Sequence, residues 1–225
     1  MASRRTGSQV FHPSINTLSK IGIVGGVLLI FGCGIALTAL FRSPFAIRVR
    51  DPIEQPIPFS HKHHVTDDGI DCRYCHMSVD QSSFADIPPT ETCMTCHSQI
   101  WNQSPMLEPV RESFRTGQPI QWIRVNDVPD FVYFNHSIHI AKGVGCETCH
   151  GRVDQMPLTW KANTLYMQWC VNCHRHPEQY VRPKDQIFTM GYQPSVDQET
   201  LGRQLVKEYH IQSPSRLDDC YICHR

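Results

Sequence analysis

The chain has 225 residues, and its 21 basic and 21 acidic side chains give a formal net charge of zero. This balance gives no electrostatic support for nucleic-acid binding, so we expect no nucleic-acid partner. Cysteine and histidine are abundant instead, at 11 and 13 residues, which points toward metal or redox chemistry.

An uncharged apolar segment occupies residues 21–41. At about 1.5 Å per residue, a helix of this length spans a hydrocarbon core of about 30 Å. We therefore predict a cytoplasmic N-terminus over residues 1–20 and a transmembrane anchor over 21–41. A cleaved signal peptide and lipidation of Cys33 are the alternatives. The segment is longer than the apolar region of a signal peptide, about 7–15 residues, and it continues past Cys33.

A proline-rich stretch over residues 42–58 follows the anchor, and we predict an extended linker there. Five Cys-x-x-Cys pairs come next, each followed at once by a histidine. In c-type haem attachment the two thiols bond to the haem vinyl groups, and the adjacent histidine binds the iron. We therefore predict five covalently bound haem c groups. The attachment residues are Cys72, Cys75, Cys93, Cys96, Cys146, Cys149, Cys170, Cys173, Cys220 and Cys223, and the proximal ligands are His76, His97, His150, His174 and His224.

Zinc ribbons are the main alternative, because the spacing between neighbouring pairs also suits two Cys-x-x-Cys halves of one zinc site. Disulfides or a thioredoxin-like motif are further alternatives. A histidine after all five pairs would be a rare coincidence when histidine is 13 of 225 residues. Haem attachment also predicts the side of the membrane, since c-type haems are attached outside the energised membrane. The expected location is the inner (cytoplasmic) membrane, with a periplasmic or extracytoplasmic haem domain.

Two similar segments, FSHKHH at residues 59–64 and FNHSIH at residues 134–139, each precede two attachment motifs. A low-spin haem needs a second axial ligand, usually histidine or methionine. Histidines three residues apart lie on one side of a helical turn, so each segment can supply two distal ligands. We predict that His61 and His64 serve the haems of His76 and His97, and that His136 and His139 serve those of His150 and His174.

Other residues of these segments have different expected roles. Phe59 and Phe134 are expected to pack on porphyrin. His63 is left out of the ligand set, because its counterpart Ile138 cannot bind iron.

The haem of His224 has no such segment. Met190, in IFTMGY, is its predicted distal ligand, and His210 is the runner-up; Met156 and Met167 lie between haems that are already supplied. A His/Met haem has a higher potential than a bis-His haem.

The chain beyond residue 41 is short for five haems, so a protein-only core must be small. The predicted fold is mostly irregular with short α-helices, a multihaem cytochrome c with class III-like modules and one N-terminal transmembrane helix. We expect a first dihaem module over residues 59–130. Residues 131–225 are expected to form a second dihaem module plus the C-terminal fifth haem.

Most of the chain beyond residue 58 resembles the pentahaem cytochrome c subunit of alternative complex III, a membrane quinol:acceptor oxidoreductase. The resemblance rests on the two histidine segments, WIRVNDVPDFVYFNHSIH, CETCHGRVDQM, LYMQWCVNCHRHPE and CYICHR. It implies four bis-His haems and one His/Met haem. It also implies the membrane and several proteins as partners: an iron–sulfur subunit, polytopic quinol-site subunits, monohaem cytochrome subunits, and a soluble acceptor protein or terminal oxidase.

The predicted function is electron transfer from quinol, oxidised in partner subunits, to a periplasmic acceptor. On this prediction the chain has no catalytic site of its own, since the redox chemistry belongs to the haem. One alternative is a multihaem enzyme of the nitrite or hydroxylamine type, which needs an open iron position. Another is a free-standing membrane-tethered quinol dehydrogenase or a reaction-centre donor.

Overall fold

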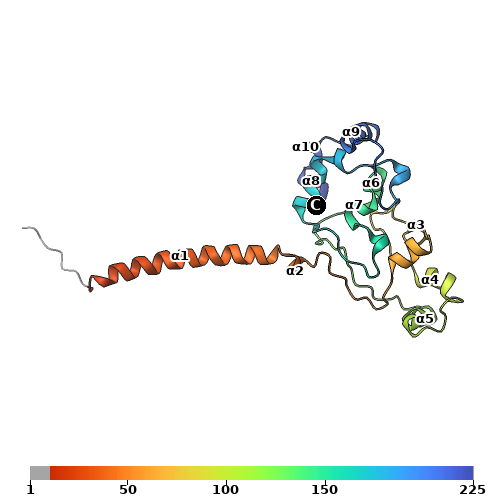
Figure 1. Ribbon diagram of the computed structural model, residues 1–225, viewed down its shortest axis with the longest axis horizontal. Coiled ribbons are helices and arrows are strands. Elements are labelled where there is room, and N and C mark those ends of the chain that lie inside the picture. The colour runs from red at the N-terminus through yellow and green to blue at the C-terminus, as the bar shows by residue number, and fades with distance from the viewer. Residues whose placement is uncertain (1–10, 225) are drawn as a thin grey trace, which may run out of the picture. The chain divides into compact units, whose positions relative to one another are not determined.

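The computed structural model describes residues 11–224, so residues 1–10 of the predicted cytoplasmic segment lie outside the description. The chain divides into two compact units at Arg48. The main element of the first unit is α1 (Ser14–Phe41), a helix of 28 residues (Figure 1). It begins before the predicted segment and is followed by α2 (Pro44–Ile47). α1 is long and apolar enough to cross a membrane, and both a membrane anchor and a signal sequence have these properties.

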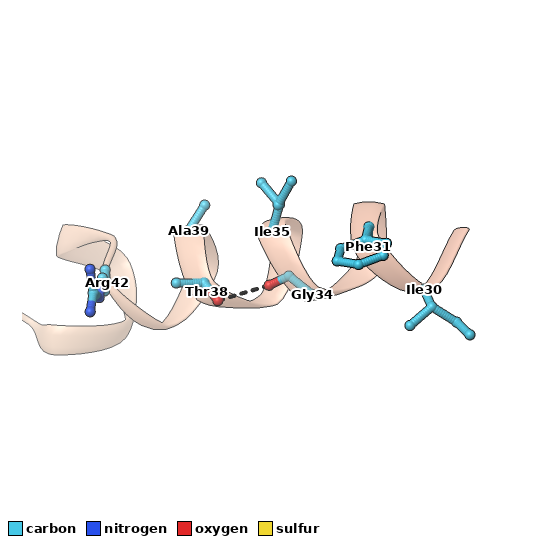
Figure 2. A pocket seen from close by; sticks show the side chains of 7 residues that line it. All are labelled: Ile30, Phe31, Gly34, Ile35, Thr38, Ala39 and Arg42. Carbon is cyan, nitrogen blue, oxygen red and sulfur yellow. Dashed lines mark hydrogen bonds between the residues drawn. The ribbon is translucent and has the colours of Figure 1, made fainter. Parts of the chain in front are cut away.

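A shallow hollow runs along α1 from Ile30 to Arg42 (Figure 2). Its lining is apolar except for Thr38 and Arg42. The Thr38 hydroxyl donates to the Gly34 carbonyl at 2.8 Å. This bond satisfies the hydroxyl within the helix, as apolar surroundings require.

The second unit begins at Val49 and consists of short helices joined by irregular segments (Figure 1). Residues 11–224 contain three isolated β-bridges but no strand, which agrees with the expectation of a mostly irregular fold with short helices. The α-helices are α3 (Cys72–Cys75), α4 (Thr90–His97), α5 (Glu108–Thr116), α6 (His136–Ala141), α7 (Cys146–His150), α8 (Met167–Arg175), α9 (Gln198–Glu208), α10 (Pro214–Leu217) and α11 (Cys220–Cys223). The tighter and wider turns are the π-helical η1 (Lys62–Asp67) and the 3₁₀ turns η2 (Pro105–Leu107), η3 (Val153–Gln155), η4 (Pro177–Gln179) and η5 (Lys184–Gln186).

The later part of the predicted linker is extended and bonded to a distant segment. The Arg50 amide donates to the Lys161 carbonyl at 2.8 Å, and the Ile53 amide donates to the Thr159 carbonyl at 3.3 Å. Pro52 also forms a bridge with Trp160. Residues 50–53 therefore fix the position of residues 159–161.

Two of the attachment helices have an aspartate as their N-cap residue. The Asp71 side chain accepts from the Arg73 amide at the start of α3, and the Asp219 side chain accepts from the Tyr221 amide at the start of α11. A carboxylate at this position satisfies an amide that has no partner within the helix. The same cap therefore orients the first and the last attachment motif.

Two small clusters of buried apolar side chains lie in the described part of the second unit. Ile57, Leu107 and Val110 form one, against Cys93 and Trp122. The other consists of Val181, Leu205 and Tyr209, with four apolar residues packed around them. So small a protein core agrees with the expectation that a chain this short for five haems has little protein-only core.

The contact between α9 and η4 gives a test of the second cluster. A Cβ atom added at Gly202 would lie 1.8 Å from the Glu178 carbonyl oxygen. Gly202→Ala should therefore force α9 away from η4 and lower the free energy of unfolding by about 1–3 kcal/mol. Denaturant unfolding of the haem-loaded protein measures this. Gln204→Ala, at an exposed position of the same helix, is the control, and equal stability of the two variants would contradict the packing described here.

Candidate metal centres

The five attachment motifs all lie on helical turns. α3, α7 and α11 each begin at the first cysteine of a motif. The second motif forms the end of α4, and the fourth motif lies within α8. All eleven cysteines are free of disulfide bonds. The ten motif thiols are therefore available for covalent attachment.

Several of these thiols are partly buried. Burial raises the pKa of Cys146 and Cys149 to about 12 and that of Cys173 to about 11. The thiols are therefore neutral at physiological pH, because burial penalises the thiolate. Within residues 11–224, no group of three or more Cys, His, Asp or Glu side chains is arranged to hold one metal ion. The zinc-ribbon alternative thus has no preformed cluster there.

In three pairs of imidazole rings, the two ring centres lie at nearly equal distances from each other. An imidazole nitrogen lies about 2 Å from a transition metal that it binds, so two rings on opposite sides of one ion have centres about 6 Å apart. Each pair joins a predicted distal ligand to a predicted proximal one. The ring centres are 6.2 Å apart for His64 and His97, 6.4 Å for His136 and His150, and 6.2 Å for His139 and His174. Their spacing therefore suits one iron between the two rings of each pair.

His61 is the remaining predicted distal ligand. Burial lowers its pKa to about 4, and the neighbouring imidazole of His76 contributes next, ahead of those of His64 and His150. Burial likewise lowers the pKa of His150 to about 4. These rings are therefore neutral at physiological pH, which is the form that binds a metal.

Four of the five predicted proximal histidines are oriented by hydrogen bonds from the ring nitrogen Nδ1. A backbone carbonyl can only accept, so the ring nitrogen beside it must donate, and the lone pair is then on Nε2. Nε2 is thus left free to face a metal. The Nδ1–oxygen distances are 2.8 Å for His76 to Asp86, 3.0 Å for His97 to Ile100, 3.0 Å for His174 to Leu217 and 3.1 Å for His224 to Phe131.

Three predicted distal histidines are held in the same way. His64 donates to the Ser60 carbonyl at 2.9 Å, and His139 donates to the Asn135 carbonyl at 2.7 Å, both four residues back along the chain. His136 donates to the Ser83 carbonyl at 3.0 Å. The fourth, His61, has the Thr159 hydroxyl 3.0 Å from Nδ1 instead of a carbonyl.

His63, which was left out of the predicted ligand set, has different surroundings. Its Nδ1 lies 3.7 Å from an Asp67 carboxylate oxygen, and its Nε2 lies 3.5 Å from one of Asp68. Its ring stacks on Trp101, with centres 6.0 Å apart. With a carboxylate beside each nitrogen, His63 has no free edge for a metal.

The phenylalanine of each histidine segment lies against both imidazoles of that segment. Phe59 meets His61 edge-on at 4.9 Å and stacks on His64 at 4.5 Å. Phe134 repeats this arrangement, edge-on to His136 at 4.7 Å and stacked on His139 at 4.5 Å. The expected packing of these phenylalanines on porphyrin is untested, but their contacts show a second role. They fix the angle between two imidazoles that face different partners.

The two predicted modules are bonded to each other at these sites. His136, in the second half, takes its Nδ1 partner from Ser83 in the first half, and its amide donates to the same carbonyl. His61, in the first half, has its partner Thr159 in the second half. Residues 49–225 accordingly form one compact unit, although the predicted boundary at residue 130 is not itself tested.

The segment around Met190 lies beside the third attachment motif. The Cys146 amide donates to the Ile187 carbonyl at 3.2 Å, and the Gly191 amide donates to the Glu147 carboxylate. His224, by contrast, contacts Phe131, with ring centres 5.8 Å apart. The described contacts therefore do not bring Met190 together with His224, and its ligand role remains a prediction.

The runner-up, His210, adjoins a different element. Its carbonyl accepts from Lys142 Nζ at 3.3 Å, which places this backbone beside the end of α6. Sequence reasoning missed the Nδ1 partners altogether, because most are backbone carbonyls, which every residue type carries.

Comparison with known proteins adds independent information. A family model described as cytochrome c7 and related cytochrome c matches residues 132–225. The chain is also 28% identical over 180 residues to the multihaem cytochrome c subunit of menaquinone reductase from Nitratidesulfovibrio vulgaris; the match covers 76% of this chain and 77% of that protein.

These matches confirm the fold class, a helix-rich chain with a cytochrome c7-like multihaem domain and one apolar N-terminal helix. A cytochrome c7-like domain implies covalently bound haem c, for which the neutral thiols and free Nε2 edges are suited. The likeness to a menaquinone reductase subunit is consistent with electron transfer in a quinol oxidoreductase.

Proposed function

We propose that this chain carries five covalently bound haem c groups and relays electrons between a quinol-site protein and an acceptor outside the cytoplasm. The observation that carries the proposal is the set of three imidazole pairs with centres 6.2–6.4 Å apart. Where Nδ1 of such a ring donates to a carbonyl, the lone pair is on Nε2, which is then free to bind iron. A closed pair of ligands on each iron suits electron transfer, whereas catalysis on a substrate needs an open position.

Each set of residues has a separate part in this proposal. The ten motif cysteines hold the haems, the five adjacent histidines are proximal ligands, and His61, His64, His136 and His139 are distal ligands. Haem supplies the one-electron chemistry, while the chain fixes the position, ligation and electrostatics of each group. The chain then has no catalytic site of its own and acts as a subunit of a larger oxidoreductase.

The proposed complex is related to alternative complex III, and α1 is the proposed single-pass anchor in the inner membrane, with the haem unit outside. The sequence resemblance supports an iron–sulfur subunit, polytopic quinol-site subunits and monohaem cytochromes as partners. Electrons would then pass from quinol to a soluble acceptor protein or a terminal oxidase.

A second candidate reverses the direction of transfer. The relative from Nitratidesulfovibrio vulgaris is named for menaquinone reduction. In that case this chain would collect electrons outside the cytoplasm and deliver them to the quinone site. The two directions use the same ligands and differ in which partner reduces the haems.

Replacing one distal histidine tests the relay and its ligands together. In complex purified from native membrane, His139→Ala should convert one haem from low to high spin, and quinol should reduce the haem set about 10–100-fold more slowly. Spin state is read by electron paramagnetic resonance, and reduction by stopped-flow absorbance. Replacing quinol with a chemically reduced acceptor distinguishes the two directions.

His63→Ala is the matched control, since His63 lies in a similar segment but has carboxylates beside both ring nitrogens. It should change neither spin state nor rate. A His139→Ala protein that keeps every haem low-spin would contradict the ligand assignment.

The fifth distal ligand was predicted to be Met190, but the contacts around His224 make Met167 a second candidate that we also propose to test. Arg175 pairs with Asp218 at 2.6 Å. Burial raises the pKa of Cys170, and a charge on Cys223 raises it further. α8 and the C-terminal residues therefore run side by side in opposite directions.

Met167 lies at the end of α8 that this arrangement brings toward His224. It is three residues before Cys170 and shares its face of the helix. Its side chain is 68% exposed, so protein atoms do not enclose its sulfur.

Variants of the two methionines can distinguish these donors. A methionine–iron bond gives a weak red absorption band in oxidised cytochromes and a higher potential. Met167→Ala should abolish the band and lower the highest potential, while Met190→Ala should leave both unchanged. Loss of the band only in Met190→Ala would restore the first prediction, and a band that persists in both variants would exclude both methionines.

A further inference from the structure

We propose that Thr159 is a positioning residue whose hydroxyl gives His61 a weaker hydrogen bond than a backbone carbonyl would. The haem attached at Cys72 and Cys75 then has a higher reduction potential than it would have with a carbonyl partner, and a lower one than with no partner at all. This inference rests on the proposed ligation of that haem by His61.

His61 differs from the other predicted distal histidines in the group that its Nδ1 contacts. The other three predicted distal histidines donate to backbone carbonyls at 2.7–3.0 Å. His61 alone among them has a side-chain hydroxyl as its partner, Thr159 Oγ1 at 3.0 Å. The two Phe-x-His-x-x-His segments therefore match in their rings but differ in this one contact.

The chemistry of the partner affects the electron density on the ring. Donation from Nδ1 to a strong acceptor makes an imidazole a more basic ligand, which favours ferric over ferrous iron. A peptide carbonyl is a strong acceptor that cannot donate. A threonine hydroxyl is a weaker acceptor that can also donate. With Thr159 as its partner, His61 gives less electron density to iron than it would with a carbonyl.

Thr159 is held in place by its backbone. Its carbonyl accepts from the Ile53 amide at 3.3 Å. The next two residues also pair with the extended segment, through the bridge between Trp160 and Pro52 and the bond from Arg50 to Lys161. The hydroxyl is thus presented to His61 by a segment that is fixed on its other side.

The repeated motif alone would give its haems similar reduction potentials, but the different hydrogen-bond partners make these potentials unequal. His64 shares the segment of His61 but donates to the Ser60 carbonyl. The two irons served by this segment should therefore differ in potential, which gives the relay a preferred place for an electron.

Thr159→Val tests this, because valine keeps the shape of threonine but accepts no hydrogen bond. In a spectroelectrochemical titration of the intact chain, one haem should become easier to reduce by about tenfold in its equilibrium constant, which is about 59 mV for one electron. Thr159→Ser keeps a hydroxyl and should retain the wild-type potentials. Thr66→Val is the matched control, since its hydroxyl donates to the Asp154 carbonyl at 2.6 Å and contacts no predicted ligand.

Unchanged potentials in Thr159→Val would overturn the proposal, and so would an equal shift in Thr66→Val. If Thr159→Val does not mature, the wild-type protein still decides. In the reduced, ¹⁵N-histidine-labelled chain, the Nδ1 proton of His61 should resonate upfield of that of His64, because its hydrogen bond is weaker. An equal or downfield position would overturn the proposal. His61→Ala tests separately whether His61 binds iron at all. If every haem in that variant stays low-spin, His61 is not an iron ligand, and the ligation on which the Thr159 proposal rests is wrong.

Discussion

A hydrogen bond from Nδ1 decides which edge of an imidazole faces a metal, and much of this fold serves to place the acceptors of such bonds. Segments far along the chain supply several of them. Leu217 provides the carbonyl for His174, and Phe131 provides the one for His224. The irregular segments between the short helices are therefore as important to the metal centres as the helices that hold the cysteines.

The same constraint explains why the second unit needs so little protein core. Its two buried clusters lie around Leu107 and Leu205, and hydrogen bonds between distant loops add to them. Bonds that cross between the predicted modules, such as His136 to Ser83 and His61 to Thr159, join the centres into one framework. Under the proposed function, covalently held haems would be the redox-active groups of the protein and would also fill part of its interior.

The chemistry of the candidate sites, haem attachment and iron ligation, could be predicted from residue types because it depends on the side chains of cysteine and histidine. The repeated segment predicted which two haems each pair of distal histidines serves, but not which histidine faces which; the 6.2 Å between ring centres groups His64 with His97 and His139 with His174. The acceptors at Ser60 and Asn135 are backbone atoms and leave no compositional signal. The ligand role of Met190 remains a prediction, because the described loop contacts join its neighbours to the third motif and show nothing of its position relative to the fifth.

The central claim is that all five Cys-x-x-Cys-His motifs hold haem. The most direct measurement is the amount of haem per chain in protein matured in its native membrane, from the pyridine haemochrome assay together with the intact mass. We expect five haem c groups, each attached by two thioether bonds. Four or fewer haems in fully matured protein, or zinc bound at the cysteine pairs, would contradict it.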